Sequence, residues 1–258
     1  MMPKIKSPSI GRCIYCDRDS STVELTCEHV VPLALDGQYI LVDASCKYCA
    51  KVTGAIEQAC LRGMLLEART HLGMKTRRPK ERPTTFPAFL TTPDGPLRKD
   101  LPLSENPFLL RLPLLADPPI LIGNVGGEYI AHLAPIFWTF IGARTPEQRA
   151  SIEKIHSKEF TYAPTQFALF LAKIAHCSAV FAKGYGNFEP LLPSLIITRS
   201  QSISDFVGRC AKPHDERRDT SFHMFVANER EFITAELCMF AHLGAPYYKV
   251  IVGKRKAS

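Results

Sequence analysis

The fold is decided by residues 12–50, which read RCIYCDRDSSTVELTCEHVVPLALDGQYILVDASCKYCA. This stretch contains two Cys-x-x-Cys pairs, Cys13 with Cys16 and Cys46 with Cys49, and 29 residues separate the pairs. Four thiolates that can reach one tetrahedral centre are what a structural zinc ion requires. We therefore predict a single zinc ion bound by all four cysteines.

The zinc ion is expected to be structural. A unit of about 60 residues buries too little apolar surface to be stable alone, whereas zinc contributes on the order of 10–16 kcal/mol of apparent binding energy to such peptides. A redox role for the two pairs is the alternative, but no βαβ pattern surrounds them. The chain has nine cysteines, no secretory signal and no run of 18 apolar residues. These features predict a cytoplasmic protein with no disulfide framework and no membrane partner.

A carboxylate next to a histidine lies between the two cysteine pairs, in the string Glu28-His29-Val30-Val31-Pro32, and a turn signal follows at Asp36-Gly37. This string, both cysteine pairs and a helix that opens at the second pair resemble the HNH family of endonucleases. The resemblance covers about 60 of the 258 residues. It implies a ββα-metal, treble-clef-like fold stapled by zinc.

The chemistry of phosphodiester cleavage agrees with these residue types. An in-line nucleophile needs a base that takes a proton from water and a divalent ion that holds the leaving oxygen. His29 is suited to be the base because an ordinary histidine, with a pKa of about 6.5, is mostly neutral at pH 7. Glu28 is suited to bind Mg²⁺ or Mn²⁺ through a hard oxygen ligand. Adjacent side chains of a strand face opposite sides, so both serve one site only where the strand is distorted or ends, an arrangement that the resemblance implies.

The sequence departs from the family pattern at Ala50. Many HNH nucleases have an Asn or His at this position, which supplies the second ligand of the catalytic metal, and alanine cannot coordinate an ion. Thr53 and Glu57 follow on the same helix face. Thr53 is nearer to Ala50 and Glu57 is the better ligand, so we predict that Glu57 completes the site. The alternative is an ordinary solvent-facing glutamate.

Three parts of unequal size are expected along the chain. Residues 1–75 form the zinc-binding HNH module, which ends in one helix from about Cys49 to Gly73. Residues 76–106 are rich in Pro, Thr and charge and are expected to be an irregular linker. Residues 107–258 are expected to be a separate α+β domain of unknown function. Strands are expected at 120–125, 128–133 and in three runs near the C-terminus, and helices at 145–157 and 164–183. The overall fold class is therefore α+β.

Positive charge is concentrated after the predicted module. The chain carries a net charge of +7, and the stretch from Arg62 to Arg82 has seven basic and two acidic residues. Arg and Lys contacts to phosphate supply most of the sequence-independent affinity for nucleic acids. The residues expected to bind nucleic acid are Arg77, Arg78, Lys80 and Arg82. The alternative is a merely solvated linker.

The resulting functional hypothesis is a metal-dependent endonuclease that acts on DNA, expected to be double-stranded. Its structural zinc is bound by Cys13, Cys16, Cys46 and Cys49, and His29 is the general base. Glu28 and Glu57 bind Mg²⁺ or Mn²⁺. The competing hypothesis is an HNH-like zinc module that has lost cleavage and binds nucleic acid or a protein partner, and Ala50 is its main support.

Overall fold

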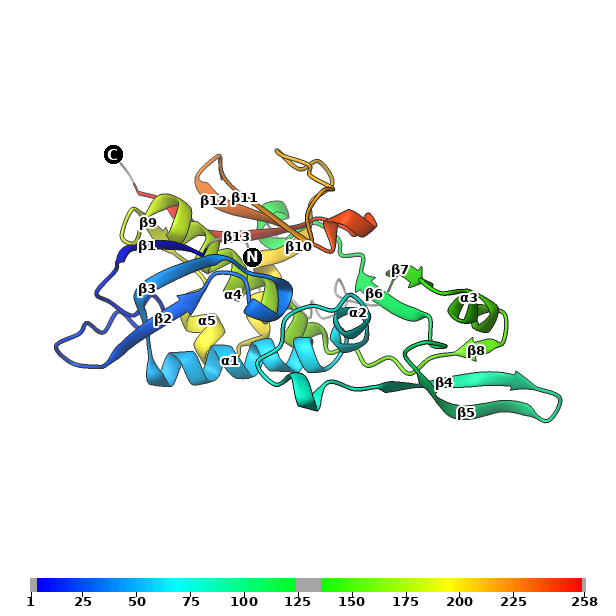
Figure 1. Cartoon of the computed structure of the whole chain (residues 1–258). Helices are drawn as coiled ribbons and strands as arrows, with labels where there is room; N and C mark the ends of the chain where they lie inside the picture. Colours follow the sequence, from blue (N-terminus) through cyan, green and yellow to red (C-terminus); the bar gives the residue numbers. More distant parts are fainter. Residues whose placement is uncertain (1–3, 124–135, 257–258) are drawn as a thin grey trace.

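The computed structural model describes residues 4–123 and 136–256, which form a mixed α+β fold of small sheets around one long helix (Figure 1). The first sheet has the order β1-β3-β2, in which β2 is antiparallel and β1 parallel to β3. The elements of this part are β1 (Ile5–Ser9), β2 (Leu25–His29), η1 (Leu33–Leu35), β3 (Tyr39–Cys46) and α1 (Lys47–Arg62). The zinc-ligand candidates therefore lie on a hairpin followed directly by a helix.

The helix predicted to run to Gly73 is interrupted. It ends at Gly63, and α2 (Leu66–His71) follows after a short turn. A Cβ atom at Gly63 would lie 2.6 Å from the carbonyl oxygen of Ala59, so the backbone there passes too close to the helix for any side chain. The expectation of a single helix was wrong because apolar residues every fourth position continue through this turn.

Residues 76–106 contain a hairpin where the sequence predicted an irregular linker. The short helix η2 (Pro79–Glu81) leads into β4 (Thr85–Thr92), which pairs with β5 (Gly95–Pro102) in antiparallel register. Thr92 pairs with Gly95, so Pro93 and Asp94 form a two-residue turn, and Phe86 and Ala88 are buried on one face. The buried face and the two-residue turn are typical of a β-hairpin, whereas the prolines of this stretch predicted an irregular segment.

The middle of the chain agrees only in part with expectation. The capping box of Thr145 and Gln148 is confirmed, but α3 (Pro146–Ile152) is short because Ile155–Ser157 forms β8, which pairs with β4. Residues 119–122 form the 3-10 helix η3 rather than a strand, and the predicted strand at 128–133 lies outside the described residues. A separate two-stranded sheet joins β6 (Phe108–Pro113) to β7 (Phe137–Gly142).

The predicted helix at 164–183 and the three C-terminal strands are confirmed. The last sheet has the order β10-β13-β12-β11, with β9 also paired to β13. The chain that connects the strands of this sheet also forms two short helices that pack on α4. The elements are α4 (Pro164–Lys183), β9 (Phe188–Pro190), α5 (Pro193–Thr198), η5 (Gln201–Phe206), β10 (Val207–Arg209), β11 (Phe222–Glu229), β12 (Phe232–Met239), η6 (Ala241–Leu243) and β13 (Tyr248–Arg255).

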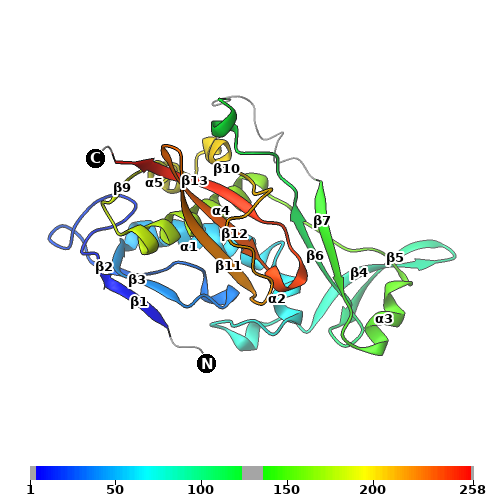
Figure 2. The ribbon, with the colours of Figure 1, turned by 90° about the horizontal axis from the view of Figure 1, so that it is seen from above.

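Helix α4 is the centre of the molecule. It lies between the C-terminal sheet and α1, as Figures 1 and 2 show from two sides, and every residue from Phe167 to Val180 is buried. Its length and hydropathy would also allow it to cross a membrane, but 78% of the relevant window is buried inside the fold. One continuous apolar core joins residues of the predicted zinc module to residues of the C-terminal sheet. The domain boundaries at residues 75 and 106 stay predictions, although residues before 75 and after 106 belong to this one core.

Candidate metal centre and carboxylate site

The four cysteines of the two Cys-x-x-Cys pairs form one cluster. Their sulfur atoms all lie within 4.8 Å of one another, and the Sγ atoms of Cys16 and Cys46 are 3.8 Å apart. A tetrahedral ion with bonds of about 2.3 Å to sulfur requires sulfur atoms about 3.8 Å apart. The four residues therefore fit a structural metal such as zinc.

Local structure holds the sulfur atoms of this cluster in place. Cys46 is the N-cap of α1, and its sulfur accepts a hydrogen bond from the backbone N–H of Cys49 at 3.5 Å. The guanidinium of Arg18 donates to the sulfurs of Cys16 and Cys46 at 3.4 and 3.7 Å. This cation offsets part of the negative charge that four thiolates around one divalent ion would carry. A hydrogen bond from Cys49 lowers the pKa of the Cys13 thiol below its ordinary value.

Glu28 and His29 lie at the end of β2, where its pairing with β3 is irregular. Thr26 pairs with Ser45 and Glu28 pairs with Leu41, so β3 contains extra residues opposite Cys27, and Asp43 adopts a positive φ of 51° within them. A shared site for the two side chains required a distorted or terminating strand at this point, and both features occur. Glu28 is buried, whereas His29 is half-buried.

The carboxylates of Glu28 and Glu57 meet at one cation, the ammonium of Lys173. Its Nζ atom lies 2.7 Å from Oε1 of Glu28 and 2.7 Å from Oε1 of Glu57. It also donates to the backbone carbonyl oxygen of His29. The side chain of Lys173 is 0% exposed, that of Glu28 9% and that of Glu57 20%. The two predicted metal ligands are thus brought together, but around a lysine that was not among the predicted site residues.

The charges of this site follow from burial and mutual attraction. Burial alone would lower the pKa of Lys173, but the attraction of Glu28 and Glu57 outweighs it and raises that pKa well above its ordinary value. Burial raises the pKa of Glu28, and Lys173 opposes this effect. Lys173 is therefore an ammonium ion at neutral pH.

His29 is chemically suited to accept a proton. Burial lowers its pKa, and the nearby cations Lys173, Lys4 and Arg77 act in the same direction, so the imidazole is neutral at pH 7. Its Nε2 atom is buried and has no hydrogen-bond partner among the described residues. The ring thus has one free nitrogen next to the carboxylate cluster.

Of the two candidate ligands on this face of α1, Thr53 and Glu57, only Glu57 contacts Lys173 among the described ion pairs. Ala50 lies in the first turns of α1 and offers no ligand, as the sequence showed. The hydroxyl of Thr53 is buried and donates to the carbonyl oxygen of Ala50 at 3.3 Å, which ties it to its own helix. Glu57 is therefore the side chain of α1 that contacts Lys173, the cation that also pairs with Glu28, and it is not a simple solvent-facing glutamate.

Two further contacts attach α4 to the first cysteine pair. The Tyr15 hydroxyl lies 3.2 Å from the Cys177 sulfur, and Nε2 of His176 lies 3.0 Å from the carbonyl oxygen of Ile14. Lys173, His176 and Cys177 thus lie on one face of the helix, which meets the cysteine unit. The sequence signal was Lys173 itself, since it is the single charged residue between Pro164 and Ala182 and a buried charge requires partners.

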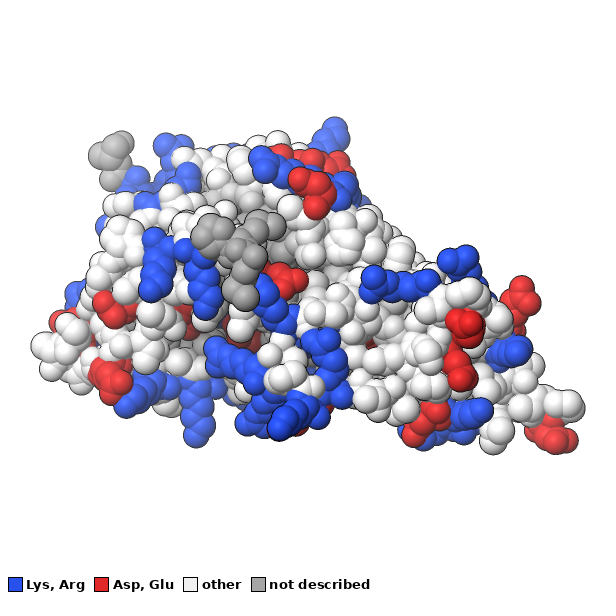
Figure 3. Space-filling model, in the orientation of Figure 1, with Lys and Arg blue, Asp and Glu red and all other residues white. Residues whose placement is uncertain are grey.

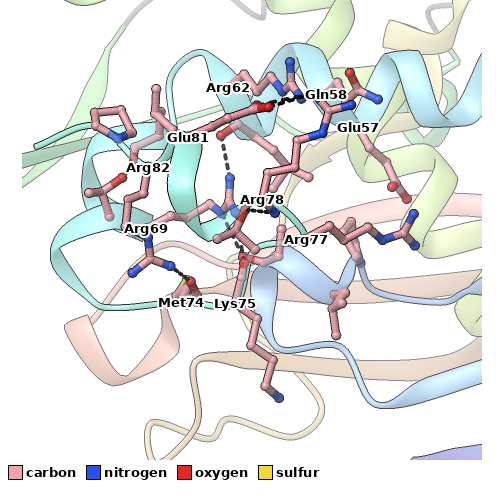
Figure 4. Close-up of a pocket in the computed structure, with 18 of the residues that line it drawn as sticks. Glu57, Gln58, Arg62, Arg69, Met74, Lys75, Arg77, Arg78, Glu81 and Arg82 are labelled. Carbon is pink, nitrogen blue, oxygen red and sulfur yellow. Dashed lines mark hydrogen bonds and ion pairs between the residues drawn. The ribbon is translucent and has the colours of Figure 1, made fainter.

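A pocket of about 490 Å³ opens beside this site (Figure 4). Glu57 lies on its wall, together with the basic side chains of Arg62, Arg69, Lys75, Arg77, Arg78 and Arg82. Figure 3 shows Lys and Arg side chains gathered on this face of the molecule. Three of the four residues predicted to bind nucleic acid therefore line one cavity, and Lys80 lies exposed on η2 without lining it.

The basic side chains of the pocket are of two kinds. Arg69 donates to the carbonyl oxygens of Ala34, Leu61 and Lys75, and Arg82 donates to that of Met74, so these two hold the walls together. Arg78 pairs with Glu81 at 3.1 Å. Arg62 and Arg77 make no ion pair with the described residues. They are the cations that a ligand would meet without breaking an existing contact.

The comparisons with known proteins found no matching family model, no matching curated protein and no matching solved structure.

Proposed function

We propose that this protein binds nucleic acid on the face that carries the basic pocket, and that a zinc-stapled hairpin and α1 position that face. The observation that carries the proposal is the set of arginines around the pocket, of which Arg62 and Arg77 have no ion-pair partner among the described residues. Arginine binds phosphate oxygens through a planar fork of N–H donors. Six basic and two acidic side chains line the cavity, so a polyanion is the favoured ligand.

The position of the pocket links it to the HNH-like residues. Glu57 lies on the pocket wall, and Arg77 is close enough to His29 to lower the pKa of its imidazole. A strand whose phosphates contact Arg62 and Arg77 would therefore pass beside His29. This arrangement supports the resemblance-based expectation of a nucleic-acid partner.

Cleavage of the bound strand is the second candidate function. Its specific support is His29, a neutral imidazole with an unpaired buried nitrogen next to Glu57. Against Mg²⁺- or Mn²⁺-dependent cleavage, both proposed metal ligands already pair with Lys173. Binding without cleavage is therefore our first proposal and the metal-dependent endonuclease our second.

Fluorescence anisotropy with labelled double-stranded DNA, single-stranded DNA and RNA over a salt series tests binding. Zinc-loaded protein is expected to bind at least one of them. The Arg62→Ala/Arg77→Ala variant should weaken binding and reduce the salt slope by about one per lost phosphate contact. Arg149→Ala, an exposed arginine on α3, is the control and should bind like the wild type. Equal binding by the pocket variant and the control would refute the role of the pocket.

A plasmid assay separates the two candidates. Supercoiled plasmid is incubated with zinc-loaded protein and Mg²⁺, Mn²⁺ or EDTA, beside the His29→Ala variant. We expect bound but intact plasmid in every lane. Metal-dependent nicking that disappears in His29→Ala would replace our first proposal with the endonuclease.

A further inference from the structure

The ammonium of Lys173 is surrounded as a bound cation would be. Its Nζ atom lies 2.7 Å from one oxygen each of Glu28 and Glu57, and it donates a hydrogen bond to the carbonyl oxygen of His29. These oxygens come from β2 and α1, whereas the lysine comes from α4. Three oxygen atoms from two other elements therefore surround the ammonium group.

We propose that the space between Glu28 and Glu57 is a cation site whose permanent occupant is Lys173, so that the chain carries its own cation where a divalent ion was expected. The lysine closes the site to Mg²⁺ and Mn²⁺. This inference goes beyond the proposed binding function and does not depend on it, because it concerns the occupancy of the carboxylate pair alone.

The dimensions and the donor set of the site do not fit Mg²⁺. That ion requires near-octahedral oxygen ligands at about 2.0–2.1 Å and retains several water molecules. Here the buried ammonium of Lys173 lies 2.7 Å from both carboxylates and takes the position that an ion bound by the pair would need. Ala50, in the first turn of α1, offers no further ligand atom from its side chain.

The charge balance points the same way. A divalent ion between the carboxylates would face the buried ammonium at close range, and like charges in a low-dielectric interior repel strongly. Lys173 cannot escape to solvent, because residues Phe167–Val180 of α4 are buried between α1 and the C-terminal sheet.

Lys173→Met tests the proposal because it removes the ammonium and keeps most of the side-chain volume. Free Mn²⁺ is measured by electron paramagnetic resonance during titration of the zinc-loaded full chain. The wild type should show no Mn²⁺ binding at the carboxylate pair. Lys173→Met should gain affinity by at least about tenfold, since two unpaired carboxylates then face each other. The double variant Lys173→Met/Glu57→Gln should lose that gain.

Lys158→Met is the matched control. Lys158 is also a buried lysine, and its ammonium contacts Glu67, the side-chain oxygen of Asn106 and the carbonyl oxygen of Pro107. Its removal leaves one carboxylate rather than two and should create no Mn²⁺ site. A folded Lys173→Met variant without increased Mn²⁺ affinity would overturn the proposal. So would wild-type Mn²⁺ binding that Glu57→Gln abolishes.

A measurement on the unmodified protein decides the question if Lys173→Met does not fold. A buried, ion-paired ammonium exchanges its protons slowly enough to give a ¹⁵N-detected NMR signal. We expect this signal for Lys173, and we expect it to survive addition of Mn²⁺ without selective broadening. Selective broadening at low Mn²⁺ concentration would place the ion at the carboxylates and contradict the inference. Neither result depends on whether the protein binds nucleic acid.

Discussion

Nε2 of His176, on α4, lies 3.0 Å from the carbonyl oxygen of Ile14, which is inside the first Cys-x-x-Cys turn. A carbonyl oxygen only accepts hydrogen bonds, so this nitrogen carries the proton and donates. The neighbouring Tyr15 hydroxyl contacts Cys177 one residue further along α4. The cysteine cluster is thus docked on the central helix through both residues that separate its first two ligands.

Because of this docking, removal of the metal should loosen α4 as well as the cysteine unit. Chelation, or Cys49→Ala, is expected to increase hydrogen exchange of the backbone amides of residues 167–180. Hydrogen-exchange mass spectrometry on zinc-loaded and chelated protein measures the effect. Cys27→Ala is the control, since Cys27 is exposed and lies outside the cluster. Unchanged protection of α4 after verified metal loss would contradict the coupling.

The three members of the carboxylate–lysine cluster should differ in their effect on stability. Lys173→Met leaves two buried carboxylates without their cation and should cost about 3–5 kcal/mol of unfolding free energy. Glu28→Gln leaves Lys173 paired with Glu57 and should cost about 1–3 kcal/mol. Glu57→Gln should cost less again, because its side chain is 20% exposed. Urea denaturation of the zinc-loaded variants gives the order, and a Lys173→Met variant as stable as wild type would refute it.

Short-range signals were sufficient for several parts of this fold. The two cysteines of each Cys-x-x-Cys pair are close because only three positions separate them, and the capping box of Thr145 and Gln148 marks the start of α3. Helix α4 begins at Pro164 and ends at Gly184, as its local residues predict. In each case the interaction that defines the element lies within a few residues in the chain.

Contacts between distant segments could not be predicted in the same way. Lys173 and His29 are 144 positions apart, and no periodicity in α4 indicates that its lone lysine faces β2 and α1. Every residue of α4 from Phe167 to Val180 is buried, so burial along the helix does not single out the side on which the lysine lies. The prolines of residues 76–106 predicted an irregular segment, although Pro93-Asp94 is the turn of the β4–β5 hairpin. Side-chain identity shows that a buried charge needs partners, but only the tertiary fold determines which partners they are.

His71 should make the stability of the protein depend on pH. Burial lowers its pKa to about 4, and Lys158 and Arg144 add to the effect. The ring stacks between Phe86 and Phe108 at centroid distances of 6.1 and 5.4 Å. An unfolded histidine titrates near pH 6.5, so the unfolded chain binds the proton first and stability falls as the pH drops from about 6.5 to 4.

The expected loss from this one histidine is at most about 3 kcal/mol over that range. His71→Phe keeps an aromatic ring between the two phenylalanines and removes the titrating group. Its unfolding free energy should therefore decrease less steeply than that of the wild type between pH 6.5 and 4.5. Urea denaturation at several pH values measures both slopes, and equal slopes would show that His71 does not contribute.

Two glycines of the unit that carries the cysteine cluster should respond in opposite directions to the same substitution. A Cβ atom at Gly37, in the turn between β2 and β3, would lie 1.9 Å from the carbonyl oxygen of Val31. Gly37→Ala must therefore displace backbone next to Glu28 and His29, and a destabilisation of about 2 kcal/mol or more is expected. At Gly54, within α1, a Cβ atom would point into open space, with no atom of another residue within 4 Å.

Gly54→Ala should stabilise the protein by about 0.5–1 kcal/mol, because alanine lowers the entropy of the unfolded chain and favours helix. Thermal and urea denaturation of the zinc-loaded Gly37→Ala and Gly54→Ala variants measures whether each substitution lowers or raises the free energy of unfolding. Gly54 also lies on the wall of the basic pocket. Gly54→Ala therefore adds a methyl group to this wall and tests whether a ligand needs that space, while the charge of the pocket stays the same. If Gly37→Ala were neutral, the close approach of the turn to Val31 would not be a constraint on the Glu28–His29 end of the hairpin.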